Sequence, residues 1–330
     1  MESRALGATS LLVSRLGLGL AALGRPGYIN LGHAGDLGSD HDVATMEAHC
    51  HRVLDAAWDL GVRYFDAARS YGLAEAFLAT WLTARGIGVE VTIGSKWGYT
   101  YTAGWKIKAD HHEIKEHSLP VLQRQAAESC ALLGSHLKLY QIHSATLESG
   151  VLTDRGVLEE LDRMRASGLH IGLTVSGAHQ AQTLRQALDV KVGGRRLFDC
   201  VQATWNLLEP SAGPALQAAH DAGLGVIVKE ALANGRLTTR NAEPAFASQR
   251  MLLEREAARL QTTMDALSLA AVLAQPWADV VLSGAAIEAQ LQANVRALGV
   301  RWDRAAAECL TTLAEKPDEY WRTRGRLTWN

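Results

Sequence analysis

The segment LKLYQIHSATLESGVLTDRGVLEELDRMRASGLHIGLTV, residues 137–175, contains the repeating unit that decides the fold. Its two ends, Leu137–His143 and His170–Val175, are short apolar runs of the kind that predict buried strands. Between them, Arg155–Ser167 places apolar residues at helical spacing, and Gly168 after it readily ends a helix in the left-handed conformation. A strand, a helix and a second strand in this order predict a βαβ unit with parallel strands.

The same alternation continues in both directions along the chain. Six more runs are predicted as strands: Leu16–Leu20, Tyr64–Ala67, Val89–Ser95, Phe198–Ala203, Gly225–Lys229 and Asp279–Ser283. Five more amphipathic segments are predicted as helices: Met46–Leu60, Leu73–Arg85, Val121–Leu133, Gln180–Ala187 and Pro214–Ala222. Eight alternations fit a closed (β/α)8 TIM barrel, with an open doubly wound sheet as the alternative.

Two features frame the first strand. Arg4–Leu6 and Leu11–Val13 form a β-like pair around Gly7, which we expect to be an N-terminal hairpin that closes the bottom of the barrel. The glycines of Gly17–Gly24 resemble a dinucleotide-binding signature, but the third glycine comes too late and a Gly/Pro loop follows where a helix is required. A Rossmann domain is therefore not predicted here.

Composition excludes several classes of protein. The 330 residues are 48% hydrophobic and 21% charged, as in ordinary globular proteins, and no linker or repeat divides them, so we expect one domain over residues 1–330. A net charge of -2 gives no electrostatic footprint for nucleic acid or an acidic membrane. The N-terminus has no signal-peptide pattern and no apolar run could span a bilayer, so a cytoplasmic location is expected. The four cysteines lie far apart and predict neither a disulfide framework nor a cysteine zinc site: Cys50, Cys130, Cys200 and Cys309.

Four polar residues fall where consecutive strands end. Asp66 ends the second predicted strand, Tyr71 follows in the adjoining loop, Lys96 follows the third strand and His143 ends the fourth. In a barrel these strand ends are neighbours, so we expect the four side chains to converge on one rim. Taken singly, each residue type is more often a helix cap, a solvated charge or a structural histidine, and only the joint placement indicates a site.

Each of the four has a chemical role to offer. Asp66 would supply the counter-charge that a buried Lys96 ammonium requires. Lys96 would lower the pKa of Tyr71, which would then act as general acid toward a carbonyl oxygen or general base toward an alcohol. His143 would orient that oxygen by a hydrogen bond. Such a set suits hydride transfer to a polarised carbonyl or, in reverse, from an alcohol.

The motifs around these residues resemble the aldo-keto reductase family. They read Tyr64-Phe65-Asp66-Ala67-Ala68-Arg69-Ser70-Tyr71-Gly72, Gly94-Ser95-Lys96 and Leu139-Tyr140-Gln141-Ile142-His143, and the similarity runs from the N-terminal hairpin to Asn294. The resemblance implies a (β/α)8 barrel, a catalytic set of Asp66, Tyr71, Lys96 and His143, and a nicotinamide cofactor held without a Rossmann motif.

The resemblance also implies a set of cofactor-binding residues. Gln202 would contact the nicotinamide carboxamide and Trp205 would stack on the ring, while Ser176 stands where relatives bind the carboxamide. The loop after the seventh strand would cover the pyrophosphate, and the eighth strand end with the following helix would hold the adenosine phosphate. These two segments contribute Lys229, Ala231, Leu232, Asn234 and Gly235, then Ser283, Gly284, Gln290 and Asn294.

Two positions depart from the family pattern. Gly177 replaces the usual Asn beside Ser176, and Gln290 stands where many relatives carry the Arg that grips a 2′-phosphate. We expect NADP(H) to be favoured, with NAD(H) as the alternative cofactor.

Two long segments follow strand ends and are expected to be irregular functional loops, Gly24–Asp42 and Trp97–Pro120. The aromatic residues Trp97, Tyr99 and Trp105 would wall the substrate pocket or pack against helices. The tail with Trp321 and Trp329 is expected to fold over the barrel mouth. The histidines of His111-His112-Glu113 and His117 do not have metal-site spacing, and no metal is predicted.

The sequence thus predicts an enzyme that reduces an aldehyde or ketone to an alcohol with a nicotinamide hydride and Tyr71 as general acid. Its partner is a small carbonyl or alcohol substrate, which the sequence does not specify. Three alternatives remain: a dehydrogenase running in the reverse direction, a nucleotide-binding regulatory subunit with slow turnover, and an unrelated barrel that uses Lys96 for a Schiff base.

Overall fold

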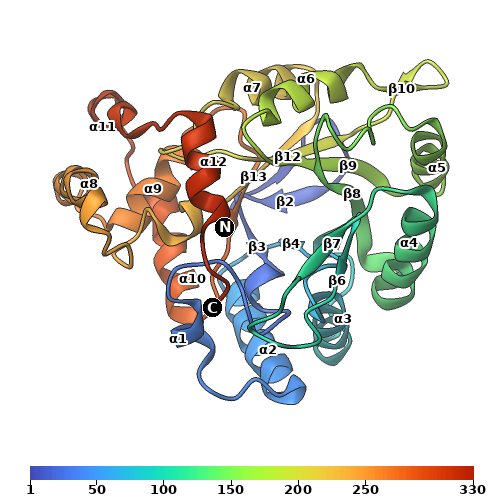
Figure 1. Cartoon of the computed structure of the whole chain (residues 1–330), viewed down its shortest axis with the longest axis horizontal. Helices are drawn as coiled ribbons and strands as arrows, with labels where there is room; N and C mark the ends of the chain where they lie inside the picture. Colours follow the sequence, from blue (N-terminus) through green and yellow to red (C-terminus); the bar gives the residue numbers. More distant parts are fainter.

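The computed structural model describes residues 1–330 and contains a closed barrel of eight parallel strands (Figure 1). The first and last barrel strands pair directly, since Val281 lies opposite Leu16 and Ser283 opposite Leu18. Closure excludes the open sheet and confirms the (β/α)8 barrel. In order around it, the strands are β3 (Leu16–Gly19), β4 (Tyr64–Asp66), β5 (Thr92–Trp97), β8 (Leu137–Ala145), β9 (His170–Val175), β12 (Cys200–Thr204), β13 (Gly225–Lys229) and β14 (Val280–Ser283).

An outer ring of helices covers the barrel (Figure 1). The Asp42 carboxylate accepts hydrogen bonds from the N–H groups of Ala44 and Thr45 and so begins the first of these helices, and Asp154 caps another in the same way. The ring consists of α2 (Val43–Asp59), α3 (Ala74–Arg85), α4 (Leu119–Leu133), α5 (Arg155–Ala166), α6 (Gln180–Asp189), α7 (Gly213–Asp221), α9 (Met264–Leu273) and α10 (Glu288–Val295). All six predicted helices are present within a few residues of their predicted bounds. No helix is long and apolar enough to cross a membrane.

The predicted N-terminal hairpin is confirmed as β1 (Ser3–Ala5) and β2 (Leu12–Ser14). Its turn requires glycine, because Gly7 has a φ of +55° and a Cβ there would lie 2.3 Å from the backbone nitrogen of Gly225. This close approach seats the hairpin against the start of β13, so that its apolar side chains fill the lower barrel core.

The two long segments are more ordered than expected. The first contains the short helix α1 (His33–Leu37), and the second contains an antiparallel hairpin of β6 (Tyr99–Tyr101) and β7 (Glu113–Lys115). The expectation of irregular loops is therefore wrong in part, because a pairing across more than ten residues leaves little local signal. The other elements are β10 (Lys191–Val192), β11 (Arg195–Arg196), α8 (Ala247–Arg259), α11 (Arg304–Leu310) and α12 (Pro317–Gly325).

The C-terminal segment returns to the first long segment. Tyr28 and Asn330 exchange two backbone hydrogen bonds of 3.1 and 3.0 Å, and the Ala34 N–H donates to the Asn330 side chain at 3.1 Å. In Figure 1 the mark for the C-terminus accordingly lies beside α1, below α12.

Candidate active site

The four predicted catalytic residues converge at the carboxyl ends of β4, β5 and β8. The buried Lys96 ammonium is paired with the Asp66 carboxylate, donates to the Ala67 carbonyl at 2.8 Å and lies 3.4 Å from the Tyr71 hydroxyl. The rings of Tyr71 and His143 meet edge to face with centroids 5.5 Å apart. The arrangement has the geometry that the strand-end positions predict.

Further hydrogen bonds fix Asp66 in this group. One of its oxygens accepts from the Tyr64 hydroxyl at 3.0 Å and from the Gln202 amide at 3.1 Å, while the other faces Lys96. These donors hold the Asp66 carboxylate, which is only 2% exposed, in one orientation. Gln202 is thereby tied to the Asp66–Lys96 pair.

Close backbone contact positions Tyr71. A Cβ at Gly24 would lie 2.2 Å from the Tyr71 carbonyl oxygen, and a Cβ at Gly72 would lie 2.4 Å from the Gly24 oxygen. The Leu73 N–H donates to that Gly24 oxygen at 2.7 Å. Two chain segments far apart in sequence thus lock together where Tyr71 enters the site.

Burial sets the protonation states. Burial, followed by the Asp66 charge, raises the pKa of Tyr71 well above its usual value, and the Arg25 guanidinium lowers it only in part. Burial, followed by the Lys96 and Lys229 charges, lowers the pKa of His143 well below its usual value. The net lowering of the Tyr71 pKa expected from Lys96 is therefore wrong, because burial and the nearby carboxylates, Asp66 above all, raise that pKa instead. Tyr71 holds its proton and His143 is neutral near pH 7.

A cavity of about 570 Å³ opens next to these residues and continues across the ends of β13, β14 and β3. Its size lies within the usual range for a ligand site. Eleven of the twelve predicted cofactor residues line it: Ser176, Gln202, Lys229, Ala231, Leu232, Asn234, Gly235, Ser283, Gly284, Gln290 and Asn294. Asn234 Oδ1 is buried there without a hydrogen-bond partner, and a Cβ at Gly284 would meet nothing closer than 3.8 Å. An unpaired acceptor and an open backbone stretch at this depth fit a long polar ligand such as a dinucleotide.

Trp205 is the predicted cofactor residue that lies elsewhere. It does not line the cavity but packs edge to face on Trp277, with centroids 5.6 Å apart, in the layer between the barrel and its helices. Side chains alternate along β12, so Gln202 faces inward and Trp205, three residues on, faces outward. The structure therefore gives Trp205 no position from which to stack on a ring in the cavity.

Replacing this tryptophan tests its reassignment. We expect Trp205→Leu to lower the free energy of unfolding by about 2–4 kcal/mol, since it empties space in the outer core. The affinity for reduced nicotinamide nucleotide, measured by calorimetry, should stay within about twofold of the wild type. A tenfold or greater loss of affinity in a stable variant would show that Trp205 does contribute to nucleotide binding.

Of the three aromatic residues predicted to line a substrate pocket, one faces the cavity and two pack elsewhere. Only Tyr99 lines the cavity, where its ring lies 4.9 Å from that of His143. Trp97 is fully buried in the outer core, and Trp105 packs on Phe77 and donates its indole N–H to the His41 carbonyl. Trp97 and Trp105 therefore pack in the core, which is the alternative that the sequence left open for them.

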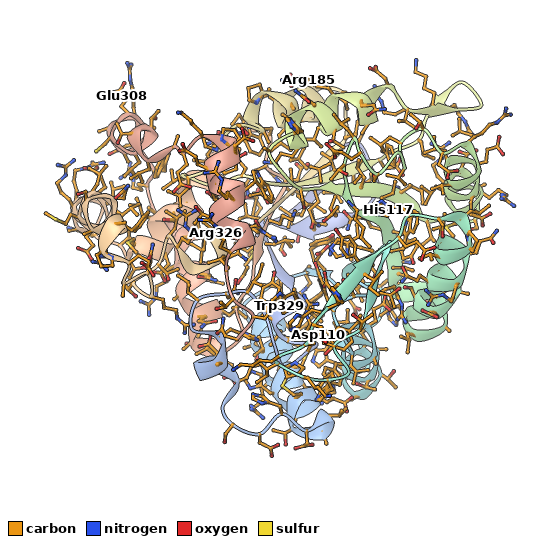
Figure 2. The ribbon with its side chains drawn as sticks, in the orientation of Figure 1. Asp110, His117, Arg185, Glu308, Arg326 and Trp329 are labelled. Carbon is orange, nitrogen blue, oxygen red and sulfur yellow. The ribbon has the colours of Figure 1, made fainter.

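The C-terminal tail closes one side of the cavity. Trp329 lines it and stacks on His112 at 3.9 Å, and Figure 2 shows Trp329 at the middle of the molecule beside the segment that carries Asp110. Trp321 packs on Tyr320 instead. The His117 Nε2–H donates to the His143 carbonyl at 2.8 Å, so His112 and His117 make packing and backbone contacts.

Three cavity ion pairs were not predicted from the sequence. Arg25, which is 2% exposed, pairs with Glu113 and lies over the rings of Tyr71 and Trp329 at 5.3 and 4.7 Å. The other two pairs are Glu230 with Arg324 and Asp36 with Arg240. In each pair the two residues lie at least 88 positions apart in the sequence, so no local sequence pattern predicts the pairing.

The family model described as "Aldo/keto reductase family" matches residues 15–314. The chain belongs to the aldo/keto reductase family. It is accordingly an NAD(P)H-dependent oxidoreductase, and enzymes of this family act on small carbonyl compounds.

Individual relatives are distant but full-length. The chain is 27% identical to the uncharacterized oxidoreductase YrpG of Bacillus subtilis, over 97% of this chain and 99% of that one. It is 25% identical to the NADH-specific methylglyoxal reductase of Escherichia coli, over 96% and 99%. The holo form of the aldo-keto reductase AKR11C1 from Bacillus halodurans superposes with a TM-score of 0.75 at 21% identity, covering 96% and 97%, which shows a shared fold.

Proposed function

We propose that this aldo-keto reductase reduces a small aldehyde or ketone to an alcohol, with Tyr71 as general acid. The observation that carries the proposal is the convergence of Lys96, Tyr71 and His143 beside the end of a dinucleotide-sized cavity. The chain would act as one domain, because its N-terminal hairpin and its C-terminal tail both pack against the barrel.

Each of the four residues has a distinct role in the proposed reaction. Tyr71 gives its proton to the substrate oxygen, and neutral His143 orients that oxygen by a hydrogen bond. Lys96 stabilises the negative charge that develops on the Tyr71 oxygen, and Asp66 keeps the ammonium in place. The nicotinamide group supplies the hydride when bound, so the carbonyl carbon gains two electrons and a proton while its oxygen gains the proton of Tyr71.

The Schiff-base alternative for Lys96 has little support. The ammonium is paired with Asp66 and donates to the Ala67 carbonyl, so it lacks the free lone pair that attack on a carbonyl requires.

The cavity end that would hold the adenosine carries little positive charge. Its only arginine, Arg240, is held by Asp36 through two hydrogen bonds of 2.6 and 2.5 Å, and Asp265 also lines this end. Gln290 turns its side-chain oxygen to the Ala286 N–H at 2.8 Å. A 2′-phosphate would meet two carboxylates and one committed cation, so this charge balance favours NAD(H) over the NADP(H) preference expected from sequence.

The Asp36–Arg240 pair offers a test of nucleotide preference. Asp36→Asn frees the guanidinium while the Leu31 carbonyl still holds it at 3.2 Å, so affinity for NADPH relative to NADH should rise about tenfold. Fluorescence titration with both nucleotides measures the ratio. The double variant Asp36→Asn/Arg240→Gln is the control and should not show the increased preference for NADPH. An unchanged affinity ratio in Asp36→Asn would contradict the assignment of this end of the cavity to the adenosine.

The proposed activity is tested by NADH oxidation in the presence of small aldehydes. Methylglyoxal is a reasonable first probe, since one relative is named for it. Formation of the matching alcohol in step with NADH loss supports the proposal. Nucleotide binding without turnover of any aldehyde or alcohol would instead favour a regulatory subunit.

A further inference from the structure

One cation near the predicted catalytic residues has no carboxylate partner. The other charged groups on this part of the cavity form pairs, Asp66 with Lys96, Glu113 with Arg25 and Glu230 with Arg324. Lys229 has no carboxylate oxygen within 4 Å, and its ammonium makes one hydrogen bond, 3.0 Å to the Ser176 hydroxyl. The paired charges cancel, so this half of the cavity carries one net positive charge.

The adjacent glutamate does not neutralise Lys229. Glu230 adopts a left-handed backbone, with a φ of +55°, and its carboxylate accepts from Arg324 at 2.6 and 3.1 Å and from Thr204 at 3.1 Å. Although burial alone would raise the pKa of Glu230, the Arg324 and Lys229 charges hold it at about 2. A left-handed conformation is costly for a residue with a side chain, so the surrounding contacts must hold Glu230 in this position.

Lys229 lies on the same wall as the residues predicted to contact the nicotinamide. Its neighbour in β12 is Thr204, two residues beyond Gln202, and its hydrogen-bond partner Ser176 lies 3.0 Å from Ser144, next to His143. The Lys229 ammonium is close enough to His143 to contribute to the lowered pKa of the imidazole. Since a carbonyl polarised by Tyr71 and His143 needs the hydride donor beside it, the ring belongs in this half of the cavity.

We propose that Lys229 makes the site discriminate between the two redox forms of the nicotinamide nucleotide, binding the reduced form more tightly than the oxidised form. This inference rests on the proposed function. The oxidised ring carries a positive charge that the reduced ring lacks. An uncompensated ammonium in the same half of a low-dielectric cavity repels only the oxidised ring. The hydrogen bond from Lys229 to Ser176 holds that charge at the wall in both forms.

The discrimination would affect both directions of catalysis. Hydride transfer moves two electrons and one proton between the ring and the substrate carbon, and it creates or removes the positive charge of the ring. Repulsion by Lys229 makes the bound oxidised nucleotide a better hydride acceptor and speeds its release after carbonyl reduction. The site is therefore suited to alcohol oxidation as well as carbonyl reduction. The overall equilibrium between substrate, product and free nucleotides in solution is unchanged.

Lys229→Met, which removes the charge but keeps the length of the side chain, is the direct test. Calorimetry near pH 7 gives the dissociation constants for NADH and NAD⁺. Burial lowers the pKa of Lys229 to about 8, so the ammonium is mostly present at that pH. We expect the affinity for NAD⁺ to rise about tenfold relative to NADH in Lys229→Met. Lys229→Arg, which retains the charge, should keep the wild-type ratio.

The ratio of the NADH and NAD⁺ affinities separates this role from a structural one, because damage to the cavity would weaken the binding of both nucleotides together. If wild type and Lys229→Met bind both forms with the same ratio, the inference is overturned and the proposed function stands. If the wild-type protein binds neither form, both fail. Lys229→Gln provides a second neutral variant if the methionine variant does not fold, and its expected shift has the same direction.

Discussion

Tyr71→Phe should reduce the rate of carbonyl reduction by about 10²- to 10⁴-fold, the range typical for loss of a general acid. The hydroxyl lost is the group 3.4 Å from the Lys96 ammonium, and no other hydroxyl lies within hydrogen-bonding distance of that ammonium. The ring remains and keeps its contacts with His143 and Arg25, so the affinity for NADH should not change. Steady-state NADH oxidation and calorimetry measure the two quantities.

Tyr99→Phe is the matched control for this variant. Tyr99 also lines the cavity and touches the His143 ring, but it does not contact Lys96. Loss of the Tyr99 hydroxyl should therefore change the rate of carbonyl reduction by no more than about threefold. Equal losses in the two variants, or a near-normal rate in Tyr71→Phe, would show that Tyr71 is not the proton donor.

Lys96→Met should abolish turnover and destabilise the fold by about 3–5 kcal/mol, because it leaves the Asp66 carboxylate buried without its counter-charge. The donors that remain, the Tyr64 hydroxyl and the amides of Gln141 and Gln202, are neutral and cannot replace the ammonium. Denaturant unfolding measures the loss of stability.

The double variant Lys96→Met/Asp66→Asn separates stability from catalysis. Removing both charges together should recover most of the lost stability, since no unpaired charge stays in the core, while turnover remains absent. A double variant as unstable as Lys96→Met would rule out the lone carboxylate as the cause. Recovered turnover would mean that Lys96 has no part in the chemistry.

The barrel and the convergence of four residues could be predicted from sequence because both depend on order along the chain. Strand and helix periodicities alternate regularly, and parallel strands bring their carboxyl ends to one face. Helix α9 was not predicted because its residues are buried on almost every side, so it lacks the polar face that produces a helical period.

Side-chain direction was harder to predict than position. Trp97 follows Lys96 directly, so alternation along β5 sends one side chain to the cavity side and the other into the helical layer. Trp205, directly after β12, and Gln202 within it face opposite sides in the same way. A resemblance that places a residue at a strand end does not by itself fix which face of the barrel wall its side chain occupies.

The charge pairs formed by the two long segments could not be predicted from the sequence. The expected NADP(H) preference considered Gln290 alone, whereas Asp36 and Arg240 meet only when the first long segment folds against the loop after β13. Arg25 and Glu113 meet in the same way, through two insertions that cross the barrel mouth. Such pairs follow from the closed fold, since their partners lie at least 88 residues apart.

The most direct measurement is a calorimetric titration of the wild-type protein and of Gly284→Trp with NADH. Gly284 lines the cavity, and a Cβ there has open space around it, so a large side chain should fill the cavity without disturbing the barrel. The account predicts binding at one site per chain in the wild type and no binding in the folded variant. Absence of binding in the wild type, or equal binding in both proteins, would contradict it.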